Sequence, residues 1–180
     1  RSHRFRYRFH LGLCYIGSFE RFYGFSKEEC LKAIDYYHEY FSEKGLYENE
    51  VYLGVPDLLA SLKQAGKQLI VATSKPEEFS IQILKHFGLY DYFDFVAGAT
   101  MDRKRSKKSD VIQYALEQNG ITDLAHTIMI GDREHDVLGA QAQKFDSIGV
   151  LYGFGSREEL EEAGATYIAQ EVGEIAAFIG

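Results

Sequence analysis

The chain of 180 residues has little proline, cysteine and tryptophan, and it lacks a long apolar run. It contains two Pro, two Cys and no Trp. No stretch approaches the roughly 20 apolar residues of a membrane span, so we expect no membrane association. Cys14 and Cys30 form no CxxC pair and have no histidine at metal-ligand spacing. These absences exclude a disulfide framework and a zinc site, and they favour reduced thiols and a cytoplasmic location.

Charge is unevenly distributed along the chain. Its net charge is −7, yet residues 1–30 carry six basic groups against three acidic ones, a local net charge of +3. A chain that is otherwise acidic repels nucleic acid phosphates, so we interpret the arginines at positions 1, 4, 6 and 8 as solvated and expect no nucleic acid partner. The apolar stretch that follows them, residues 11–16, is too short and interrupted for a secretory signal.

Regular alternation of helix and strand signals begins at residue 26. A capping box at Ser26–Glu29 starts an amphipathic helix that Gly45 ends, and Pro56 opens a second helix that ends at Gly66. The apolar run at 69–72 that follows predicts a strand buried on both faces. Further helices are predicted at 76–87, at 109–119, from 134, and from a second capping box at 156–159, with strands at 93–97, 127–130, 148–151 and 165–169. This order predicts an α/β fold with a doubly wound parallel sheet.

Polar residues follow three of these strands, where a parallel α/β sheet places its chemistry. Thr73 and Ser74 follow the first buried strand, Lys108 ends a lysine-rich loop after the second, and Asp132 and Asp136 follow the third. Hydroxyls, amides, one ammonium and hard carboxylate oxygens suit a phosphate and a divalent cation. Each group also has a structural interpretation: the hydroxyls as helix N-caps, the basic run as a solvated loop, and the aspartates as favourable charges at a helix N-terminus.

The order of these motifs resembles the haloacid dehalogenase superfamily of phosphatases, in particular its phosphoglycolate phosphatase and 5′-nucleotidase-like branch with a helical cap. The segments that carry the resemblance are Val71–Pro76, Arg105–Ile112, Ile130–Asp136, Gly149–Ser156 and Glu162–Ala165. The resemblance runs from about residue 19 to the end of the chain. It implies three parts: an atypical N-terminal segment (1–18), a partial helical cap (19–50) and a catalytic core (51–180).

The resemblance also implies a role for each residue. The Thr73 hydroxyl and the Ser74 amide would hold the transferring phosphoryl group, and Lys108 would neutralise charge on that group and on the nucleophile. Asp132 would bind Mg²⁺ directly, with Asp136 supporting the metal directly or through water. The expected substrate is a small phosphorylated metabolite such as a nucleoside monophosphate, hydrolysed as a phosphomonoester.

One family motif is missing from this chain. The family's first strand ends in Asp-x-Asp-Gly-Thr, whose aspartates serve as nucleophile and as general acid and base, but no two aspartates here are separated by a single residue. We therefore expect no appreciable turnover from this chain alone. The alternative function is a non-catalytic protein that still binds phosphate or metal. The missing strand would lie at the centre of the sheet. Residues 5–16 either supply a substitute strand or belong to a loosely packed or disordered N-terminal arm, and the sequence favours the arm.

The cap region offers several aromatic residues for the leaving group of the substrate. They can stack on a nucleobase, or they can form the core of the helical cap, and the sequence leaves both interpretations open. These residues are Tyr23, Phe25, Tyr36, Tyr37 and Tyr40.

Overall fold

A computed structural model describes residues 19–20, 23–43, 45–102 and 104–179. The α-helices are α2 (Lys27–Glu43), α3 (Val55–Gln64), α4 (Glu77–His86), α5 (Lys108–Gln118), α6 (Glu134–Ala142), α7 (Arg157–Glu162) and α8 (Ile175–Ile179). The strands are β1 (Ile70–Pro76), β2 (Phe95–Ala99), β3 (Ile128–Gly131), β4 (Asp146–Val150) and β5 (Tyr167–Ala169). Short 3₁₀ helices lie at Gly45–Tyr47, Tyr90–Tyr92, Leu124–His126 and Val172–Glu174.

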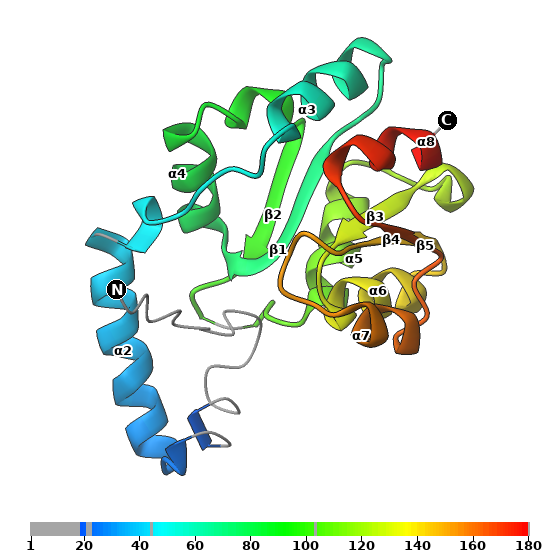
Figure 1. The fold of residues 1–180 in the computed structure, drawn as a ribbon. Coiled ribbons are helices and arrows are strands. Elements are labelled where there is room, and N and C mark those ends of the chain that lie inside the picture. Colours follow the sequence, from blue (N-terminus) through cyan, green and yellow to red (C-terminus); the bar gives the residue numbers. More distant parts are fainter. Residues whose placement is uncertain (1–18, 21–22, 44, 103, 180) are drawn as a thin grey trace, which may run out of the picture.

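The strands form two parallel groups rather than one continuous sheet. Among the described residues, β1 pairs only with β2, and β4 pairs with β3 on one side and β5 on the other. Figure 1 shows the pair β1–β2 with α4 on one side and α5 on the other, and the group β3–β5 next to α6 and α7. The predicted α/β class with parallel strands is therefore confirmed, and the sheet is divided between β1 and β3.

The hydrophobic core is divided at the same place. One cluster joins β1, β2 and α5 around Ala97, Val111 and Ala115, and a second joins β4, β5 and α8 around Ile148 and Ile175. In β2 and β4 four of five residues are buried, whereas residues 70–75 of β1 and all of β3 are only half-buried. Apart from the short β5, the two strands that border the division are thus the less covered ones among the described strands.

Local signals account for most element boundaries. The Ser26 amide donates to Glu29 Oε2 at 2.8 Å and the Glu29 amide donates to Ser26 Oγ at 3.3 Å, which confirms the capping box that starts α2. Gly66 follows α3 with φ +73°, a conformation that favours glycine. The candidate substitute strand at 5–16 lies outside the described residues.

Two boundaries differ from the sequence prediction where the candidate site begins. β1 was expected to end at Ala72, but it continues to Pro76, and its pairing with β2 shifts register between Ala72 and Pro76. Lys108 was expected in a loop, but it is the first residue of α5. In both places contacts between elements accompany the difference. β1 pairs with β2 as far as Pro76, and the Lys108 side chain contacts Ala72 and Asp136.

Helix α2 stands apart from both strand groups in Figure 1. The 3₁₀ turn that follows it returns the chain to the core, where the buried Leu46 packs against Phe79 of α4. No helix in the described ranges combines the length and the apolar character that crossing a membrane requires.

Candidate active site

Lys108 links β1 of one strand group to the first turn of α6, the helix that follows β3 of the other. Its Nζ donates to the carbonyl oxygen of Ala72 at 2.8 Å and forms an ion pair with Asp136 Oδ1 at 2.7 Å. Only 12% of the Lys108 side chain and 9% of the Asp136 side chain are exposed. Of the two interpretations of the basic run, the structure therefore excludes simple solvation for Lys108.

Asp136 has both carboxylate oxygens engaged within the described residues. While Oδ1 pairs with Lys108, Oδ2 accepts a hydrogen bond from the Arg133 amide at 3.1 Å, at the N-terminus of α6. The aspartate thus stabilises the start of α6 and orients the lysine. The family resemblance implies that Asp136 supports the metal ion, and in the structure its carboxylate pairs with Lys108.

Asp132 lies under a tight loop that follows β4. The Phe154 amide donates to Asp132 Oδ2 at 2.8 Å, and the Gly155 amide donates to the Asp132 carbonyl oxygen at 2.9 Å. A Cβ atom on Gly153 would lie 2.2 Å from Asp132 Cβ, and one on Gly155 would lie 2.1 Å from the Asp132 carbonyl oxygen. Only glycine permits this approach, and the loop leaves Oδ1 without a hydrogen bond from the described residues.

Thr73 and Ser74 lie within β1, directly after Ala72, whose carbonyl oxygen Lys108 contacts. Thr73 Oγ1 accepts a hydrogen bond from the Lys75 amide at 3.2 Å, so it does not cap α4, which begins at Glu77. The Ser74 hydroxyl is buried and has no hydrogen-bond partner among the described residues. Because a buried hydroxyl without a partner costs free energy, this atom is a position where a ligand oxygen would be stabilised.

Two tyrosines lie within the electrostatic reach of Asp132. The rings of Tyr52 and Tyr152 meet edge to face with centroids 5.1 Å apart. Burial, together with the charges of Tyr52 and Asp132, raises the pKa of Tyr152 to about 12. Burial and the Asp132 charge also raise the pKa of Tyr52. Both phenols therefore stay protonated at neutral pH beside the carboxylate.

Several contacts at the site had no clear signal in the sequence. Arg105 points inward and pairs with Glu77 at 3.0 Å, whereas its neighbour Lys104 is exposed and pairs with Asp102. Ser156 caps α7 as predicted, because its Oγ accepts a hydrogen bond from the Glu159 amide at 3.1 Å, whereas Glu159 Oε1 accepts from Arg133 Nε at 2.7 Å. The pairs Arg105–Glu77 and Arg133–Glu159 join residues more than 20 positions apart in the sequence, which periodicity cannot detect.

The sequence does carry a signal for one close contact at the site, a glycine within a helix. Gly139 lies inside α6, where glycine is unfavourable by about 1 kcal/mol relative to alanine and therefore points to a packing requirement. A Cβ at this position would lie 2.9 Å from Lys108 Cγ and 2.7 Å from Ile112 Cδ1. Gly139 thus lets α6 approach α5 where Lys108 begins that helix.

No described contact joins the aromatic residues of the cap region to the predicted phosphate and metal residues. Tyr23 and Phe25 pack with Phe19, with ring centroids 5.6 to 5.9 Å apart, and Tyr36 is 74% exposed on α2. The side chains of Tyr37 and Tyr40 lie outside the described part of the structure.

Comparison with known proteins agrees with this fold. A family model for haloacid dehalogenase-like hydrolases matches residues 4–150. The 5′-nucleotidase of Pseudomonas aeruginosa is 40% identical over 154 residues, which are 86% of this chain and 69% of that protein. The crystal structure of a predicted phosphatase from Clostridium acetobutylicum superposes with a TM-score of 0.87 at 51% identity, covering 93% of this chain and 77% of that one. The chain therefore belongs to the haloacid dehalogenase-like hydrolase family.

The relatives differ in length and in the activity for which they are named. Tyrosine-protein kinase PtkA of Mycobacterium tuberculosis is 38% identical over 142 residues, which are 78% of this chain but 48% of PtkA. The family match begins at residue 4, within the segment that the sequence set apart by its basic charge. Family membership supports a phosphoric monoester hydrolase, and the relatives carry names for different substrates.

Proposed function

We propose that this chain binds the phosphate group of a small phosphomonoester together with Mg²⁺, at a site of the 5′-nucleotidase or phosphoglycolate phosphatase type. The observation that carries the proposal is the position of Lys108, whose ammonium group joins Ala72 of β1 to Asp136 in the first turn of α6, the helix that follows β3. An ammonium group has three N–H donors, and the Ala72 carbonyl and Asp136 engage two of them. No described residue takes the third, which is available for a phosphoryl oxygen. The buried Ser74 hydroxyl follows Ala72 by two residues in β1.

Magnesium fits this site only together with a substrate. The described residues contain no group of three or more His, Cys, Asp and Glu that could hold a metal ion. Mg²⁺ is usually bound by one or two carboxylates, with water and substrate phosphate completing its shell. Asp132 Oδ1 supplies one such oxygen, and Asp136 would support the ion directly or through water. When bound, the ion would neutralise charge on the phosphate.

Turnover requires a nucleophile that this sequence does not provide in the family's pattern. The chain has no Asp-x-Asp pair, and covalent phosphoryl transfer of this type depends on such a carboxylate. We therefore expect phosphate binding without appreciable hydrolysis from this chain alone. Cytoplasmic location and a nucleoside monophosphate substrate remain predictions.

Calorimetric titration with inorganic phosphate, with and without Mg²⁺, tests the binding. We expect Mg²⁺ to strengthen phosphate binding, and K108M to weaken it by at least about tenfold because one charge-assisted hydrogen bond is lost. D132N should remove the Mg²⁺ effect. D123N is the matched control, because Asp123 is exposed and pairs only with His126 near the surface. Absence of phosphate binding in the wild-type chain would contradict the proposal.

A phosphate-release assay tests the expected lack of turnover. The purified chain is incubated with Mg²⁺ and a panel of nucleoside monophosphates and phosphoglycolate. No release above the background of D132N is expected. Robust Mg²⁺-dependent release would show that another group of this chain serves as nucleophile, and it would leave the binding proposal standing.

A further inference from the structure

Arg105 contacts three different elements next to the phosphate site. Its Nε donates to the Gly98 carbonyl oxygen in β2 at 2.9 Å, and its Nη2 donates to Glu77 Oε2 in the first turn of α4 at 3.0 Å. Its guanidinium carbon lies 3.5 Å from the centre of the Tyr114 ring in α5. The side chain is only 19% exposed, so these contacts are largely shielded from water.

The contact with Glu77 lies where α4 begins, three residues after Ser74. Glu77 Oε2 also accepts a hydrogen bond from the Gly98 amide at 3.2 Å. A Cβ on Gly98 would lie 2.4 Å from Glu77 Cα, so the backbone of β2 touches the start of α4 directly. The Arg105–Glu77 pair thus sits on a close-packed junction that holds the end of β1 in place.

The main chain of Arg105 closes the loop that leads to Lys108. The Thr100 amide donates to the Arg105 carbonyl oxygen at 2.9 Å, and the Arg105 amide donates to Thr100 Oγ1 at 3.1 Å. Thr100 Oγ1 in turn donates to Asp102 at 2.6 Å. The loop is therefore a closed hydrogen-bonded turn, and its remaining freedom is set by where the Arg105 side chain is anchored.

We infer that Arg105 is a positioning residue, which locks the loop before α5 to the start of α4 so that Lys108 stays on the Ala72 carbonyl beside Ser74. A lysine side chain is flexible and does not fix its own ammonium group, whereas the planar guanidinium combines directional hydrogen bonds with ring stacking. This inference deepens the proposed function, because it says what holds the phosphate-binding cation in place.

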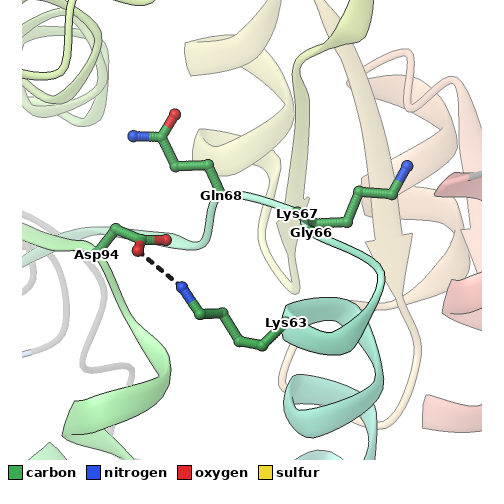
Figure 2. A pocket seen from close by; sticks show the side chains of 5 residues that line it. All are labelled: Lys63, Gly66, Lys67, Gln68 and Asp94. Carbon is green, nitrogen blue, oxygen red and sulfur yellow. Dashed lines mark hydrogen bonds and ion pairs between the residues drawn. The ribbon is translucent and has the colours of Figure 1, made fainter.

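A second ion pair on the same strands provides a matched control. Lys63 Nζ in α3 pairs with Asp94 Oδ1 at 2.7 Å, and Asp94 Oδ2 accepts from the Leu69 amide at 2.8 Å (Figure 2). This pair lies where β1 and β2 begin, at the opposite end from Lys108. Lys63 belongs to α3, and Leu69 and Asp94 directly precede β1 and β2. Loss of this ion pair therefore perturbs the same two strands at the end away from the phosphate site.

Competitive acetylation of the intact chain, quantified for each lysine by mass spectrometry, reports the position of Lys108 without requiring enzymatic activity. In the wild-type chain we expect Lys108 to react far more slowly than the exposed Lys104. R105Q should raise the Lys108 rate by about tenfold, the effect of losing one charge-assisted hydrogen bond. R105K should not restore protection, because lysine reproduces neither the fork nor the stacking.

The controls separate positioning from general loosening. K63M should leave the Lys108 rate unchanged, even where its melting temperature falls as much as that of R105Q. Should R105Q fail to fold, E77Q decides, because it removes the charge of the partner and keeps its shape. Unchanged Lys108 labelling in a folded R105Q or E77Q protein would overturn the inference. A wild-type chain that protects Lys108 but binds no phosphate would contradict the proposed function and not the role of Arg105.

Discussion

The Lys108–Asp136 ion pair should contribute strongly to stability as well as to phosphate binding. The two groups are 2.7 Å apart, and about nine-tenths of each side chain is buried. K108M keeps the apolar stem of the side chain and removes its charge. It leaves the Asp136 carboxylate buried with only the Arg133 amide as a described partner, and it leaves the Ala72 carbonyl without its lysine donor.

The expected loss is about 3 to 5 kcal/mol in the free energy of unfolding, because removing one partner of a buried pair leaves an uncompensated charge. Urea unfolding at neutral pH measures it, with an unchanged m-value showing that the same surface is exposed. The control is K32M, which breaks the exposed i,i+4 pair between Lys32 and Glu28 and should cost at most about 0.5 kcal/mol.

A double variant isolates the cause. K108M/D136N removes both charges, while the asparagine oxygen can still accept the Arg133 amide. It should be more stable than K108M alone, because no charge is left buried and unpaired. If K108M unfolds at the same urea concentration as K32M, or if the added D136N lowers the stability further, the reasoning about the buried pair is refuted.

Three further outcomes follow from the same geometry. G155A should cost about 1 to 3 kcal/mol and weaken Mg²⁺-dependent phosphate binding, since its Cβ would collide with the Asp132 carbonyl, whereas G173A in open space should be neutral. The free energy of unfolding that depends on the Tyr152 phenol is fully present below pH 10, the pKa of an ordinary tyrosine, and is lost as pH rises through the folded pKa of about 12. In Y152F, unfolding measured across this pH range should lack the Tyr152 contribution to this pH dependence. Among the described strands only β4 is paired on both sides, so its backbone amides should exchange with deuterium more slowly than those of β1 and β3; equal protection would contradict this difference in pairing.

Prediction from sequence succeeded where the signal is local. The capping box at Ser26, the glycine after α3 and the short apolar runs identified the elements and their order, because caps and periodicity depend on neighbouring residues. The same pattern placed Thr73, Lys108 and Asp132 at the carboxyl ends of three strands. The structure shows Lys108 next to Ala72 and Asp136, although the catalytic and metal roles of these residues stay predictions.

The sequence by itself therefore determined the α/β class and the succession of helices and parallel strands, since these follow from the spacing of apolar and capping residues, and its motifs resembled the family that the comparisons show. Only the tertiary structure decided which charged groups meet. Asp136 pairs with Lys108, the Glu159 carboxylate pairs with Arg133, and Arg105 pairs with Glu77. The physical reason is that a buried charge must find a partner, and the nearest partner in space is set by packing between elements far apart in the chain.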